Sequence, residues 1–132
     1  MKRYVLDSYA LIAYFTGEVA GKPVIDILKK TLEGHAESFV CVVNWGEIYY
    51  ITLRENGLEK AETFRKLIEE YPIEIVNVDQ ALTLEAAKIK ASNKMSYADS
   101  FAAALTKVKK AELVTGDKEF KSVENEINIQ WI

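Results

Sequence analysis

The sequence has few of the residues that form disulfides or bind zinc in small domains. Among its 132 residues, Cys41 is the only cysteine and His35 the only histidine. One thiol cannot form an intrachain disulfide, and a chain rich in Asp, Glu and Lys with a single thiol suits a reducing compartment, so we expect a cytoplasmic protein. A zinc site built from Cys and His is excluded for the same reason.

Long apolar runs and an excess of positive charge are also missing. Lys2 and Arg3 precede an apolar stretch, but Asp7 and Ser8 interrupt it and no small-residue cleavage site follows, so we expect no signal sequence. No run approaches the ~18 apolar residues of a membrane span, and we expect no membrane association. The formal net charge is −3, so contact with nucleic acid would depend on local patches.

The residues that are present predict one α/β domain over residues 1–132. Hydrophobic residues make up 49% of the chain, which is enough for the core of a domain of this size. Short apolar runs alternate with amphipathic segments, which predicts a parallel sheet covered by helices on both faces. We expect strands at 3–6, 38–43, 73–78, 111–115 and 127–132, and helices at 9–15, 24–33, 45–56, 58–71, 80–93 and 97–110. Asn44 is expected to cap the helix at 45–56.

Four acids fall near the expected carboxyl ends of the strands. Asp7 directly follows the first strand, and Asp117 lies two residues after the fourth. Glu47 is expected in the first turn of the helix after the second strand, and Asp99 near the start of the helix before the fourth. Parallel strands bring their carboxyl ends to one crevice, near the point where the strand order reverses. Asp99 would join the other three if its helix begins at that rim.

Such a crevice predicts a divalent metal ion. Four neighbouring carboxylates repel one another, and some would be protonated with raised pKa values unless a cation lies between them. Ligand sets made only of oxygen favour Mg²⁺ or Mn²⁺, which can activate water and stabilise charge on a phosphate. Thr115 and Ser96 are candidates to hydrogen-bond the carboxylates or the attacking water. Each acid also fits a plain role as a cap or turn residue, so the hypothesis rests on the four together.

Three segments contain these acids in a specific order: YVLDSYALIAYF, VVNWGEIYYI and MSYADSFAAALTKVKKAELVTGDKEF. In this order the chain, from Tyr4 to Trp131, resembles the PIN domain family, and most of all its small toxins of the VapC type. The resemblance implies a three-layer α/β/α sandwich and a Mg²⁺- or Mn²⁺-dependent ribonuclease that cuts RNA with a metal-activated water. It makes Asp7, Glu47, Asp99 and Asp117 the catalytic and metal-binding residues. The chain departs from the family at Asn44, where a Ser or Thr is usual, which removes any role for a hydroxyl there.

The resemblance also implies a homodimer and a cognate antitoxin that blocks the active-site groove. The helices at 45–56 and 58–71 supply large apolar residues compatible with such contacts: Trp45, Tyr49, Tyr50, Leu53, Phe64 and Leu67. RNA approaching an acidic crevice would need cations at its rim, and the candidates are Lys22, Lys94, Lys107, Lys118 and Lys121. Lys118 is the best candidate for RNA contact because it adjoins Asp117.

Other interpretations fit less well. A phosphotransferase using an aspartyl-phosphate would need a second acid close to Asp7, but Ser8 and Tyr9 follow it. A nucleotide-binding fold would need a glycine-rich loop after the first strand, and LDSYALIA has no glycine. A catalytically inactive PIN-like binding module would be favoured by the loss of one or more acids, and all four are present.

Overall fold

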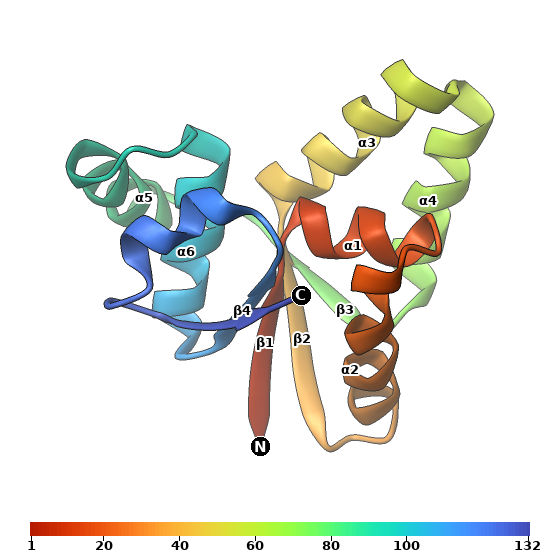
Figure 1. Ribbon diagram of the computed structural model, residues 1–132, viewed down its shortest axis with the longest axis horizontal. Helices are drawn as coiled ribbons and strands as arrows, with labels where there is room; N and C mark the ends of the chain where they lie inside the picture. Colours follow the sequence, from red (N-terminus) through yellow and green to blue (C-terminus); the bar gives the residue numbers. More distant parts are fainter.

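The computed structural model describes all residues from 1 to 132, and its elements follow the expected order (Figure 1). The chain runs through β1 (Lys2–Leu6), α1 (Ser8–Phe15), the short 3₁₀ helix η1 (Val19–Gly21), α2 (Lys22–Leu32), β2 (Ala36–Cys41), α3 (Val42–Asn56), α4 (Leu58–Glu70), β3 (Ile73–Val76), α5 (Gln80–Ser92), α6 (Tyr97–Lys109), β4 (Glu112–Thr115), the 3₁₀ helix η2 (Lys118–Val123) and β5 (Asn128–Trp131). No helix has the length and apolar character needed to cross a bilayer.

The sheet has five strands in the order β3-β2-β1-β4-β5, and every pair is parallel. Its central strand is β1, with β2 and β3 on one side and β4 and β5 on the other. The strand order therefore reverses at β1, and the switch point lies between the carboxyl ends of β1 and β4. Asp7 and Asp117 follow these two strands, so the topology brings them to the same place.

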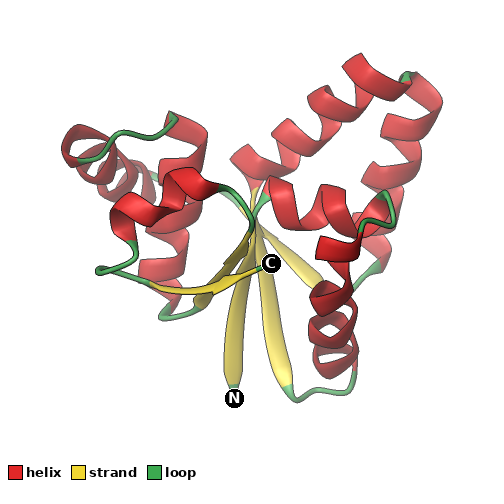
Figure 2. Cartoon of the chain, in the orientation of Figure 1, coloured by secondary structure: helices red, strands yellow, loops and turns green.

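Helices cover both faces of the sheet, which confirms the predicted α/β/α sandwich (Figure 2). Side chains of successive strand residues point to opposite faces. In β1, Val5 packs into the core under α5 and α6, whereas Tyr4 and Leu6 pack into the core under α1, α2, α3 and α4. The central strand β1 thus contributes side chains to two separate hydrophobic cores.

The expected boundary between β2 and α3 is wrong. β2 ends at Cys41, where its pairing with β3 ends, and α3 begins at Val42. Cys41 is extended, with φ −70° and ψ 139°, and it precedes the helix without a side-chain cap. The β-branched Val42 and Val43 therefore belong to the helix, because packing overrides their strand propensity. Asn44 is not the cap, and Glu47 lies in the second turn of α3 rather than the first.

Candidate active site

Asp7 forms the floor of the site at the end of β1. Its side chain is 1% exposed and also caps α1, since Oδ1 accepts the Ala10 N–H at 2.9 Å. Oδ2 accepts a hydrogen bond from the Thr115 hydroxyl of β4. The same hydroxyl oxygen accepts the Asp117 N–H at 3.0 Å. Thr115 therefore connects the two acids across the switch point.

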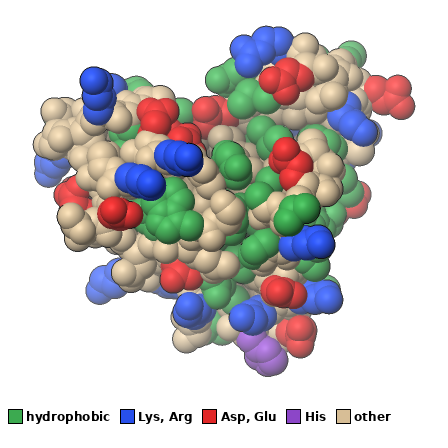
Figure 3. All heavy atoms as spheres, in the orientation of Figure 1, with side chains coloured by type: hydrophobic (Ala, Val, Ile, Leu, Met, Phe, Trp, Pro, Cys, Tyr) green, Lys and Arg blue, Asp and Glu red, His purple; other side chains and the backbone are tan.

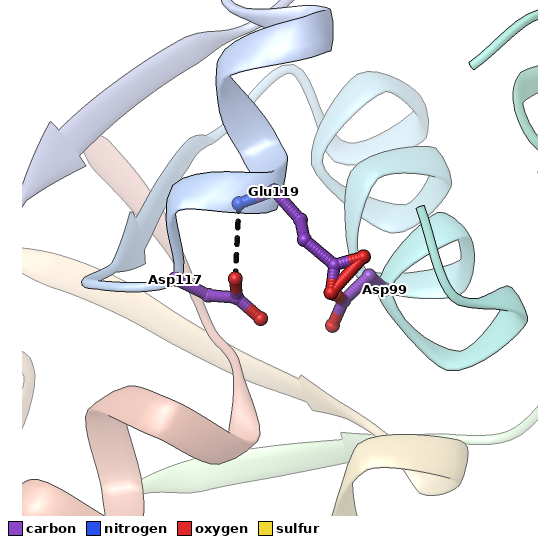
Figure 4. A group of neighbouring side chains, drawn as sticks. All are labelled: Asp99, Asp117 and Glu119. Atoms are coloured by element: carbon purple, nitrogen blue, oxygen red, sulfur yellow. Dashed lines mark hydrogen bonds between the residues drawn. The ribbon is translucent and has the colours of Figure 1, made fainter. Parts of the chain in front are cut away.

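Asp117 stands at the start of η2 and brings a further acid to the site. Its Oδ1 accepts the Glu119 N–H at 3.0 Å, which begins the turn that directs Glu119 back toward α6. Carboxylate oxygens of Asp99, Asp117 and Glu119 lie within 4.8 Å of one another (Figure 4). The candidate acids expected from the sequence did not include Glu119. The only available signal was its position two residues after Asp117.

Asp99 joins the site because α6 begins at the rim of the sheet. Ser96 is the N-cap of α6, and its hydroxyl oxygen accepts the Asp99 N–H at 3.1 Å. Asp99 lies in the first turn and is 6% exposed. The helix of Asp99 thus begins at the rim, as Asp99 needed in order to join the other three acids. Ser96 binds the backbone N–H of Asp99 and not its carboxylate.

Glu47 reaches the site from α3 and is held by Asn44. The Asn44 Nδ2 donates to Glu47 Oε1 at 2.9 Å and to the carbonyl oxygen of Ala98 at 3.3 Å. Asn44 is wholly buried, and its Oδ1 has no hydrogen-bond donor in the protein. A buried acceptor without a partner is costly, and a donor such as an ordered water would remove that cost. Asn44 thus ties α3 to the start of α6 and orients the second acid.

The acids meet in one open cleft of about 380 Å³. Glu47, Asp99, Asp117 and Glu119 line it, whereas the buried Asp7 lies outside its lining. The remaining lining residues are Ser8, Tyr9, Ile12, Glu18, Ile51 and Ser96, so no Lys or Arg is among them. In the space-filling view the molecule is hollowed at the top, and acidic side chains lie in the hollow (Figure 3).

Burial and mutual repulsion raise the pKa values of two of these acids. Burial raises the pKa of Asp7 to about 7, although hydrogen bonds from Thr115 and Ala10 lower it in part and the charges of Asp117 and Glu47 raise it. Burial likewise raises the pKa of Asp99 to about 8, with the charge of Asp117 and a hydrogen bond shared with it as the next causes. None of the acids forms a salt bridge. This oxygen-only, cation-free set fits Mg²⁺ or Mn²⁺.

The PIN domain family matches residues 4–126 of the sequence. The chain belongs to the PIN domain family. This confirms the resemblance carried by the three acid-bearing segments. No curated protein matches the sequence.

Solved structures share the fold of this PIN domain over nearly its whole length. A chain of VapBC2 from Rickettsia felis, bound to a promoter DNA fragment, aligns with a TM-score of 0.76 and 15% identity, over 97% of each chain. A chain of DNA-bound VapBC from Salmonella typhimurium gives 0.76 and 14%, over 98% of each. VapC20 from Mycobacterium tuberculosis, a sarcin–ricin loop cleaving toxin, gives 0.69 and 14%, over 94% of this chain and 95% of VapC20. The common element is the VapC-like PIN fold.

Three residues that the sequence suggested for contact with a protein partner or with RNA do not line the cleft. Phe64 is buried and stacks on Phe15 with ring centroids 4.7 Å apart, so it belongs to the core of the PIN domain. Lys107 lines a separate hollow with residues 124–128, on the C-terminal half of α6, and cannot be a rim residue. Lys118 is exposed at the start of η2 but does not line the cleft. Its contact with RNA stays a prediction.

Proposed function

We propose that this PIN domain is a metal-dependent ribonuclease that hydrolyses phosphodiester bonds of RNA, and that it acts in the cytoplasm as the toxin of a toxin–antitoxin pair. One observation carries the proposal: the acids at the family's positions converge on the switch point of the sheet without any cation to balance them. The similarity to VapC20, a toxin that cleaves the sarcin–ricin loop, supports RNA as the substrate.

Asp7, Glu47, Asp99 and Asp117 would hold the ion, and Glu119 is near enough to two of them to take part. A bound Mg²⁺ or Mn²⁺ would lower the pKa of a water molecule and offset charge on the phosphate. The protein's own groups prepare the ligands. Thr115 fixes Asp7 and the backbone of Asp117, and Asn44 fixes Glu47. Asp7 and Asp99 hold protons near neutral pH and would release them on metal binding.

Protein partners have an exposed surface available near the end of α3. Tyr50 is 50% exposed and Leu53 39% exposed on α3, and Leu58 at the start of α4 is 63% exposed. Exposed apolar groups of this kind support an interface, either a homodimer or the contact with an antitoxin. Sedimentation velocity at tens of micromolar tests the dimer, and a single monomeric species would remove that part of the proposal.

Cleavage of a mixed pool of structured RNAs tests the activity. We would compare Mg²⁺, Mn²⁺ and chelator for the wild type, Asp7→Asn, Asp117→Asn and the control Glu112→Gln, whose acid lies at the opposite end of β4. We expect cutting only with metal, lost in both site variants and kept in the control, with circular dichroism unchanged. Cutting that survives chelator or both site substitutions would contradict the proposal. Metal binding without any cutting would favour the inactive binding module.

A further inference from the structure

The acidic cleft of this PIN domain also has apolar side chains in its lining. Tyr9 and Ile12 lie three residues apart on α1 and line the cleft together with Ile51 of α3. The acids come from several elements around them: Glu47 from α3, Asp99 from α6, and Asp117 and Glu119 from the start of η2. The cleft therefore combines charged groups with a surface for a flat apolar group.

Tyr9 is fixed in place by its packing against Gly116. A Cβ atom added to Gly116 would lie 2.3 Å from Cε1 and 2.5 Å from Cζ of the Tyr9 ring. Gly116 does not have a positive φ, so the position requires glycine for space and not for its backbone conformation. The ring thus lies against the loop between Thr115 and Asp117 and is held beside the acids.

The rest of the Tyr9 side chain is free. It is 42% exposed, it has no aromatic neighbour, and its hydroxyl makes no hydrogen bond within the protein. Aromatic side chains that are accessible at a nucleic-acid site serve as platforms on which nucleobases stack. No folding role within this chain uses the open part of the ring.

The charge of the cleft makes such a platform useful. Pairing of Lys or Arg with phosphate supplies most of the affinity of many proteins for nucleic acid. That contribution is missing inside a cleft lined by five acids and no basic residue: Glu18, Glu47, Asp99, Asp117 and Glu119. Stacking of a base on an aromatic ring is uncharged, and it raises affinity about 5- to 150-fold per base. It also requires a base that is not paired within a duplex.

We infer that Tyr9 is a stacking site for an unpaired nucleobase of the RNA, next to the phosphate that lies at the acids. The inference rests on the proposed function and deepens it by naming the residue of the cleft that contacts a base. Tyr9 would select for unpaired structure and not for one base, because every base has an aromatic face.

Binding of a short single-stranded RNA that contains 2-aminopurine tests the inference, since stacking quenches the fluorescence of this base. Ca²⁺ replaces Mg²⁺ to slow hydrolysis, and a gel checks that the RNA stays intact. Tyr9→Leu should weaken binding by about 5- to 150-fold and abolish the quenching, whereas Tyr9→Phe should keep both within about twofold. Tyr97→Leu is the matched control, because Tyr97 is exposed on α6 but does not line the cleft. The same RNA as a duplex should bind more weakly than the single strand.

The inference is overturned if Tyr9→Leu binds and quenches like the wild type, if the duplex does as well as the single strand, or if the wild type binds no RNA. Calorimetry of Ca²⁺ binding to Tyr9→Leu separates stacking from an effect on the Asp117 loop. An unchanged Ca²⁺ affinity is expected, and a loss equal to the loss in RNA binding would make Tyr9 a positioning residue instead. Failure of the proposed function looks different: RNA binding that depends on Tyr9 would persist, but the wild type would show no metal-dependent cleavage.

Discussion

The acids at the two ends of the sheet differ in whether a cation lies beside them. At the amino end, acids of the strands are paired with cations: Lys2–Glu112 at 3.6 Å, Arg3–Glu37 at 3.6 Å and Lys109–Glu74 at 4.0 Å. At the carboxyl end, none of the acids at the site has a cation within 4 Å, and two of them are buried: Asp7, Glu47, Asp99, Asp117 and Glu119, with Asp7 and Asp99 the buried pair. The strands are the same ones, so the difference belongs to the two locations and not to the chain as a whole.

The comparison shows that the unbalanced charge is local and costs stability. Burying a carboxyl group without a counterion is unfavourable, and it is relieved by protonation or by a bound cation. Proteins retain such costs mainly where function needs them. The following predictions test the contrast between the two ends, from the largest expected effect to the smallest.

The largest effect is expected on the pH dependence of stability. Folded, metal-free protein keeps protons on Asp7 up to pH about 7 and on Asp99 up to about 8, whereas unfolded carboxyls lose them near their ordinary pKa of 3.8. The folded state binds more protons in this range, so stability should fall as pH rises from about 4 to 8. We expect the free energy of unfolding in chelator to drop on the order of 6 kcal/mol between pH 5 and pH 8. Urea denaturation measures it.

Saturating Mg²⁺ should remove part of this loss, because an ion that binds only the folded protein stabilises it, by about 2.7 kcal/mol at 100 times its dissociation constant. Stability that rises between pH 5 and pH 8 without metal, or that ignores Mg²⁺, would show that the carboxyl end is not under electrostatic strain.

The next effect is expected from Asp99→Asn. The amide has nearly the same shape, carries no charge and can donate a hydrogen bond to Asp117. At pH 8 in chelator we expect the free energy of unfolding to increase by about 2 kcal/mol, since the burial penalty of a carboxyl group is removed. Thermal denaturation provides the measurement. A destabilised variant would mean that Asp99 contributes favourable contacts that outweigh its charge.

Asn44→Ala should affect the ion more than the fold. It frees Glu47 and separates α3 from Ala98, and loss of a residue that orients a metal ligand lowers affinity by about 10-fold or more. Calorimetry with Mn²⁺ compares it with Asn56→Ala, which alters an exposed asparagine at the end of the same helix. Equal affinities in the two variants would remove the positioning role of Asn44.

The smallest effect is expected at the amino end. Glu112→Gln breaks the pair with Lys2, which is largely exposed, and such pairs contribute about 0–1 kcal/mol. We expect a loss below about 0.5 kcal/mol in urea denaturation that shrinks further with added salt. A loss as large as the gain from Asp99→Asn would erase the contrast between the two ends.

Local patterns were sufficient for much of the fold and for part of the site. Alternating strands and helices predicted the parallel sheet and its two covered faces. Asp7 and Asp117 could be placed because they lie one and two residues after the ends of strands. The start of α3 could not be predicted, because Val42 and Val43 have strand propensity. The boundary lies where the pairing of β2 with β3 ends, at Cys41.

Contacts between distant segments could not be predicted from the sequence either, because local patterns do not show which segments meet. Asn44 meets Ala98 across 54 positions of sequence, and nothing local in either segment indicates it. Glu119 reaches Asp99 only because η2 turns at the hydrogen bond from its N–H to Asp117. The packing of Tyr9 on Gly116 likewise depends on β1 and β4 being neighbours.

The central position of β1 has a consequence for how the molecule opens. Tyr4 and Val5 are paired with strands on both sides, and the side chains of β1 enter both cores. Their amide protons should therefore exchange with solvent only through global unfolding, whereas the exposed end of α3 and the turns of η2 can fray by themselves. Asp7, at the end of β1, would thus belong to the last cooperative unit to open, and η2 to the first.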